Sequence, residues 1–149
     1  MIRVDSPAAL PGAVGSSATG QWFLVDQGRI NQFAHVTEDF QWIHTDPERA
    51  ASGPFGTTVA HGLLTLSLIP RLIDGLFQVA GASAVINCGI DRVRFIEPVP
   101  NGSRIRACTE LTAAKSSRRG VRATLHHAIE VDGGLRPVLV ADTVHLFIT

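Results

Sequence analysis

The chain has 149 residues, of which 45% are hydrophobic and 17% charged, and its 13 basic and 13 acidic side chains cancel to a formal charge of zero. A chain of this length matches one domain and buries roughly two thirds of the surface that its unfolded form exposes. The high apolar fraction excludes a disordered chain, and a neutral chain has no field to attract nucleic acid or an anionic membrane. We therefore expect one globular domain with no nucleic-acid and no membrane partner.

Two further features bear on where the protein acts. Residues 1–19 are rich in small residues but lack a basic start followed by an unbroken apolar stretch, which predicts a loose N-terminal leader and not a signal peptide. Cys88 and Cys108 are too few for a disulfide framework, so we expect reduced thiols, with a single bridge as the alternative. Both features favour a cytoplasmic protein.

The elements after residue 20 begin with a short strand over residues 20–25. Asp26 is placed to cap a helix through Val36, whose apolar residues recur at helical spacing. Residues 45–51 predict a second, short helix, with Thr45 or Asp46 as its cap and Pro47 at its first position. A loop follows over residues 52–56.

The next segment predicts the central element of the fold. Thr57 or Thr58 can cap a longer helix that runs through Ile69 toward Leu76. Its apolar residues are not confined to one stripe, which is typical of a buried helix. Pro70 removes a hydrogen bond inside this span, so we expect a kink or a break there.

From residue 84 the pattern changes to strands rich in Val, Ile, Thr and Phe, over residues 84–95, 103–112, 121–131 and 138–148. Charged and apolar residues alternate in several of them, as expected for antiparallel strands with one wet face. We therefore predict an α+β fold in which a curved antiparallel sheet wraps around one buried helix.

Asp39 and His44 form the first candidate site. A carboxylate beside an imidazole supplies a base and an acid near neutral pH. Taken alone, their spacing favours the structural alternative, in which Asp39 caps the following turn and His44 is an ordinary surface residue.

His61-Gly62, at the start of the predicted buried helix, is the second candidate. A helix start offers unpaired backbone N–H groups, and glycine lets an oxygen atom approach them closely, as a developing oxyanion requires. Tight packing of Gly62 against a strand is the alternative, and both can hold. No spacing of His, Cys, Asp and Glu completes a set of metal ligands, so we expect no metal and no cofactor.

Three blocks of residues then occur in order: Thr37-Glu-Asp-Phe-Gln-Trp-Ile-His-Thr-Asp-Pro47, Gly53-Pro-Phe-Gly56 and Val59-Ala-His-Gly-Leu63. Together they resemble the hydratase motif of the MaoC-like dehydratases, the (R)-specific enoyl-CoA hydratases. Residues 86–87, 91–95 and 98–102 resemble the branch of that family related to nodulation protein N. The likeness covers most of residues 21–149.

The resemblance implies a hot-dog fold over residues 20–149 and usually a dimer whose sheets join edge to edge. It also implies reversible hydration of a trans-2-enoyl thioester to the (R)-3-hydroxyacyl thioester. Asp39 and His44 would be the catalytic pair, and the Gly62 amide would polarise the thioester carbonyl. In the version that we expect, Asp39 takes a proton from the attacking water and His44 supplies one to C2.

Two further residues are expected in supporting roles. Where many relatives have Asn-Pro between the catalytic residues, this chain has Gln41-Trp42, and Gln41 keeps an amide that can orient the pair. Asn87 either holds the catalytic loop or faces the substrate, with a buried structural amide as the alternative.

Two other functions use the same fold. A hot-dog thioesterase would hydrolyse the thioester, and a non-catalytic chain would serve as one subunit of a heterodimeric dehydratase. Because Asp39 and His44 stand in their motif, we expect an active homodimeric hydro-lyase of fatty-acid metabolism. Its substrate would be an acyl-CoA or the thioester of an acyl carrier protein.

Overall fold

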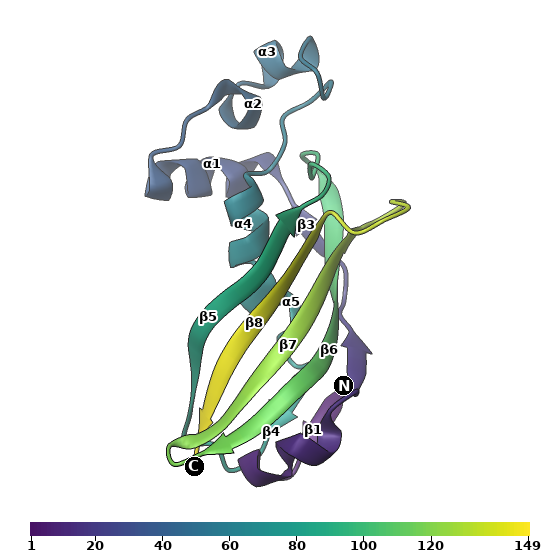
Figure 1. The fold of residues 1–149 in the computed structure, drawn as a ribbon. Coiled ribbons are helices and arrows are strands. Elements are labelled where there is room, and N and C mark those ends of the chain that lie inside the picture. Colours follow the sequence, from purple (N-terminus) through teal and green to yellow (C-terminus); the bar gives the residue numbers. More distant parts are fainter.

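Four long strands in the second half of the chain form most of the main sheet of this computed structural model, which describes residues 1–149 (Figure 1). In chain order the elements are β1 (Ile2–Val4), the 3₁₀ helix η1 (Pro7–Ala13), β2 (Ser17–Thr19), β3 (Phe23–Val25), α1 (Gln27–Thr37), α2 (Trp42–Thr45), α3 (Pro47–Ala51), α4 (Gly62–Ser67), α5 (Ile69–Leu72), β4 (Phe77–Val79), β5 (Ala84–Phe95), β6 (Ser103–Ser117), β7 (Gly120–Val131) and β8 (Leu139–Ile148).

The main sheet is antiparallel and has six strands in the order β2-β6-β7-β8-β5, with β3 also paired to β6. Its long strands curve around α4 and α5, while α1, α2 and α3 gather beyond one end of the sheet (Figure 1). The predicted α+β fold, a sheet wrapped around a buried helix, is confirmed. The strand predicted over residues 103–112 is longer than expected, since β6 continues to Ser117.

Two aspartates cap the short helices, as their positions predict. The Asp26 side chain accepts a hydrogen bond from the Arg29 amide at 2.9 Å and so begins α1. Asp46 accepts one from the Arg49 amide at 3.0 Å, with Pro47 as the first residue of α3. The loop predicted after α3 is also present.

The buried helix is shorter than predicted and lies in two pieces. It begins at Gly62 and not at the predicted threonine caps, because the Thr58 hydroxyl instead donates to Gln27 Oε1. The helix is interrupted at Leu68, which confirms the break expected from Pro70. None of the helices combines the length and the apolar character needed to cross a membrane.

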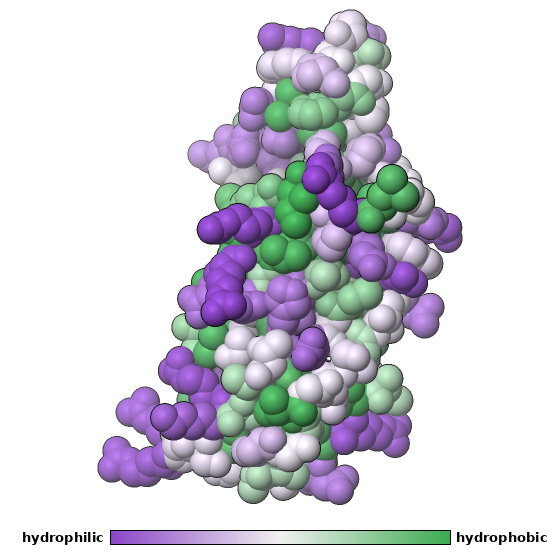
Figure 2. All heavy atoms as spheres, turned by 45° about the vertical axis from the view of Figure 1, so that its right-hand side comes forward, coloured by the Kyte–Doolittle hydropathy of each residue, from purple (hydrophilic) through white to green (hydrophobic).

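The core consists of two apolar clusters along the inner face of the sheet. The first joins α4 and α5 to the sheet, and its members include Leu64, Leu68, Ile69, Leu72, Ile105, Ile129 and Leu139. The second lies toward the other end of the strands and includes Val4, Leu10, Leu111, Leu125 and Phe147. On the face shown in Figure 2, hydrophobic residues are scattered between hydrophilic ones.

Residues 1–19 are more ordered than the loose leader expected from their composition. β1 pairs in parallel with β4, and β2 pairs with β6. The physical reason is the second cluster, in which Val4 is buried and Leu10 has no exposed surface. These residues therefore cover one end of the sheet.

A band of polar side chains separates the two apolar clusters on the inner face of the sheet. His127 has no exposed surface, and its ring nitrogens are joined to the hydroxyls of Thr109 at 2.9 Å and Thr143 at 2.7 Å. Thr143 Oγ1 also lies 2.8 Å from His145 Nε2. Burial, reinforced by the charge of His145, lowers the pKa of His127 to about 4.

We predict that stability falls as the pH is lowered from about 6.5 toward 4, because the unfolded chain then binds a proton at His127 that the folded chain does not. The complete shift corresponds to about 3 kcal/mol. Urea unfolding between these pH values measures the slope. His127→Gln, which does not titrate, should reduce that slope, and an unchanged slope would contradict the assignment.

Candidate active site

Asp39 lies on the connection between α1 and α2. Glu38 ends α1 in the left-handed conformation, at φ 58°, and this turns the chain away from the helix axis. The Gln41 amide then donates to Asp39 Oδ1 at 3.3 Å. Asp39 thus holds the turn before α2, as in the structural alternative, while its carboxylate stays exposed.

His44, on α2, is buried and has a fixed ring orientation. Its Nδ1 lies 2.6 Å from the Val59 carbonyl oxygen, and the Val59 amide donates to the Ile43 carbonyl at 3.0 Å. Because a carbonyl oxygen only accepts, Nδ1 carries the hydrogen, and in the neutral ring Nε2 keeps its lone pair.

Burial lowers the pKa of His44 below its usual value of 6.5, and the nearby His61 lowers it further. The hydrogen bond to Val59 and the charge of Asp39 act in the opposite direction. His44 is therefore neutral at physiological pH and presents an unprotonated Nε2, which is the form of a proton acceptor.

His61, immediately before α4, joins the two predicted residues into one cluster. Its ring stacks on that of His44, with 3.9 Å between centroids and 25° between planes. The Phe33 ring also lies near the His61 ring, with 5.0 Å between centroids. His61 Nε2 donates to the Asp39 backbone oxygen at 3.0 Å, and its Nδ1 is buried without a partner.

A carboxylate oxygen of Asp39 and one ring nitrogen from each of His44 and His61 lie within 4.8 Å of one another. One nitrogen of each ring already donates to a carbonyl oxygen, and the other nitrogen of His61 is buried. Because the N–H groups of both rings are occupied by carbonyl oxygens, the Asp39 carboxylate and His44 Nε2 remain as hydrogen-bond acceptors. The cluster suits a small donor such as a water molecule.

Gly62 directly follows His61 in the chain and is the first residue of α4. Its N–H has no acceptor within the chain, as expected for the first turn of a helix. A Cβ at this position would come within 2.9 Å of the Phe95 ring. Gly62 therefore both exposes an amide and packs closely against β5, so the two alternatives hold together.

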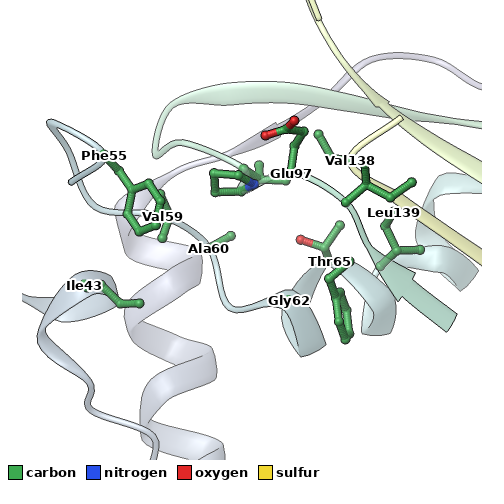
Figure 3. A pocket seen from close by; sticks show the side chains of 13 residues that line it. Ile43, Phe55, Val59, Ala60, Gly62, Thr65, Glu97, Val138 and Leu139 are labelled. Carbon is green, nitrogen blue, oxygen red and sulfur yellow. The ribbon is translucent and has the colours of Figure 1, made fainter. Parts of the chain in front are cut away.

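A cavity of about 310 Å³ opens at Gly62 (Figure 3). Thr65 of α4 and the pair Val138 and Leu139 border it, and Glu97 supplies a carboxylate at its edge (Figure 3). Most of the remaining lining is apolar, namely Ile43, Phe55, Val59, Ala60, Phe95, Ile96, Pro98 and Val99. The cavity can hold a mainly apolar group beside the Gly62 amide.

The two residues expected in supporting roles lie differently. The Gln41 side chain is exposed, and its backbone amide, not its side chain, contacts Asp39. Gln27, which the sequence pattern does not single out, donates to the His44 carbonyl at 2.7 Å. The structure does not place Asn87 in the cavity at Gly62: it lines a second cavity, of about 350 Å³, with Thr143 and others.

Comparison with known proteins finds relatives over most of the chain. The family model described as "MaoC like domain" matches residues 12–131. The 3-hydroxyacyl-thioester dehydratase Z of Mycobacterium tuberculosis is 44% identical over 146 residues, which are 97% of each chain. Nodulation protein N of Rhizobium leguminosarum bv. viciae is 38% identical over 143 residues, which are 94% of this chain and 87% of that protein.

Among solved structures, the (R)-hydratase from A. caviae involved in PHA biosynthesis matches with a TM-score of 0.75 and 28% identity. The match covers 90% of this chain and 96% of that one. The sheet wrapped around a helix is therefore the hot-dog arrangement that the sequence motifs imply.

Proposed function

Because the chain belongs to the MaoC-like dehydratase family and is a hydro-lyase, we propose that it reversibly hydrates trans-2-enoyl thioesters to (R)-3-hydroxyacyl thioesters. The observation that carries the proposal is the pairing of two opposite features. The cluster of Asp39 and His44 accepts hydrogen bonds, while the free N–H of Gly62, beyond His61, donates one. Hydration needs both, because water is activated by acceptors and the thioester carbonyl oxygen by a donor.

In the proposed reaction the water molecule is held between Asp39 and His44. As its oxygen bonds to C3, one of its protons moves to His44 Nε2 and the C2=C3 electron pair shifts toward the carbonyl oxygen. The Gly62 N–H stabilises the resulting enolate oxygen. The proton on Nε2 then moves to C2, so that one water is added and His44 returns to its neutral form.

This sequence of steps differs from the expectation that Asp39 takes the first proton. A neutral, buried His44 with a free Nε2 is ready to accept a proton, but it has none on that nitrogen to give at the start. The Asp39 charge favours protonated His44, which supports a role in stabilising the imidazolium that forms. Because one group handles the proton, oxygen and hydrogen add to the same face of the double bond.

The cavity beside Gly62 supports binding of the acyl part of the substrate. Its apolar lining suits a hydrocarbon chain, and Gly62 at its border suits the thioester carbonyl. We propose an acyl-CoA as the substrate, with the thioester of an acyl carrier protein as the other carrier to be tested.

We also propose that the active protein is a homodimer joined through β5. This strand is at the end of the sheet, so one of its edges has no strand partner. It also exposes apolar side chains that water solvates poorly: Val85, Ile86, Ile90 and Phe95. A long apolar edge strand favours pairing with a second strand, which a copy of the same chain provides.

We predict that Asp39→Asn and His44→Gln each lower kcat by about 10²–10⁴-fold. The assay is loss of enoyl absorbance with crotonyl-CoA and a longer trans-2-enoyl-CoA. The double variant should lose little more than either single variant, because the two groups act on one water. Asp132→Asn, an exposed carboxylate between β7 and β8, is the control.

Full activity in either single variant would contradict the assigned pair. If neither CoA substrate reacts, the same assay is repeated with enoyl thioesters of an acyl carrier protein. No hydration of these either would refute the proposed function. Release of free CoA from a saturated acyl-CoA would indicate a thioesterase instead.

A second prediction isolates the Gly62 amide. Gly62→Pro removes the N–H, and proline is tolerated at the first position of a helix. Gly62→Ala keeps the N–H. Like proline, alanine adds a Cβ that meets the half-exposed Phe95 ring. We expect the proline variant to have a kcat about 10²–10³-fold below that of the alanine variant. Equal activities would exclude the amide as the oxyanion donor.

We further predict that Ile86→Lys combined with Ile90→Lys converts a dimer into a monomer in analytical ultracentrifugation. Charges on the unpaired edge make a second strand costly to add. Leu135→Lys, at a fully exposed leucine between β7 and β8, should remain dimeric. A wild-type monomer, or a dimer unaffected by both lysines, would contradict pairing through β5.

A further inference from the structure

We propose that His61 is a positioning residue that holds Asp39, His44 and the Gly62 amide in their relative places. The inference rests on the proposed function for the roles of those three groups. Its basis is that one buried imidazole contacts both acid–base residues and directly precedes the third group in the chain.

The first contact fixes the backbone of Asp39. The other hydrogen bonds of residues 39–41 join them to one another or to residues 44–45 of the same segment. The bond from His61 Nε2 to the Asp39 oxygen crosses 22 positions of the sequence and ties this exposed segment to the start of α4. Without it, the Asp39 carboxylate would be held by local turns alone.

The second contact fixes the ring of His44. The hydrogen bond to Val59 sets one edge of that ring, but a single bond leaves it free to swing about the bond axis. The stacked His61 ring, 3.9 Å away, closes one side and so defines the direction of the Nε2 lone pair. Two constraints of different kinds thus orient the proton acceptor.

The third link is covalent. His61 is the N-cap residue of α4, and its backbone oxygen accepts from the Thr65 amide at 3.1 Å. Any shift of His61 relative to the helix would therefore also move the N–H of Gly62. A fixed His61 couples the water-binding side of the site to the carbonyl-binding side.

The unpartnered Nδ1 of His61 argues against a purely structural role. The side chain is 3% exposed, and leaving a ring nitrogen there without a hydrogen-bond partner costs free energy. A phenylalanine would fill the space beside Phe33 without that cost. What a phenylalanine would lose is the bond to Asp39, so the polar group is explained by the contact that it makes.

Two substitutions separate the two contacts. His61→Phe keeps an aromatic ring against His44 but cannot donate to Asp39, whereas His61→Gln keeps an amide donor near Nε2 but removes the stacked ring. We expect each to lower kcat by about 10–10²-fold with a small change in KM, since a misplacement near 1 Å costs about 10²-fold. His61→Ala, which loses both contacts, should be the least active.

Leu64→Ala is the matched control, because it weakens the same helix through the apolar core. It should lose thermal stability but keep its kcat at temperatures where it is folded. A structural role alone would make the His61 variants behave in the same way, with kcat preserved in the folded protein. That result would overturn the proposal.

A readout independent of activity is the ¹⁵N and ¹H NMR titration of the His44 ring. In wild type we expect the tautomer with hydrogen on Nδ1 and a pKa below 6.5. In His61→Phe and His61→Gln the pKa of His44 should rise, since the repulsion from His61 is gone.

Unchanged His44 signals in both variants would refute the positioning role, even if the wild-type protein showed no hydratase activity. Absent activity with shifted signals would refute the proposed function alone.

Discussion

The hydrogen bond between His44 Nδ1 and the Val59 carbonyl is the interaction on which the rest of the site depends. It joins α2 to the segment that leads into α4, and the reverse bond from the Val59 amide to Ile43 makes the connection two-sided. It also decides the chemistry, because a hydrogen held on Nδ1 leaves Nε2 as the free nitrogen. A histidine without this bond would have the same burial but no defined tautomer.

The remainder of the fold supplies a frame for that bond. The Ala60 amide donates to Val99 at 2.8 Å, which ties the segment before α4 to the chain between β5 and β6. The sheet then encloses α4 and α5, so the start of α4 is held at one end of a packed core. In the proposed reaction, Asp39 and the Gly62 amide would meet the water molecule and the thioester from this supported position. The site therefore combines an exposed carboxylate with a buried imidazole, and their environments separate their roles.

Local signals in the sequence predicted the parts of the structure that depend on near neighbours. Asp26 and Asp46 cap helices because a cap needs only the next three residues. The predicted start of the central helix was wrong because the Thr58 hydroxyl bonds Gln27, which lies 31 positions away. His61 was missed as a member of the cluster for the same reason. Its contacts with Asp39 and His44 arise from the path of the chain, and only its place beside Gly62 hinted at them.

The most direct test of His44 as the single acid–base centre is hydration of crotonyl-CoA in D₂O, followed by NMR assignment of both new stereocentres. We expect the (R)-3-hydroxy product with deuterium at C2 on the same face as the new hydroxyl, because His44 both takes the water proton and delivers it. Addition to opposite faces, or the (S)-alcohol, would contradict a single acid–base centre formed by His44 and Asp39.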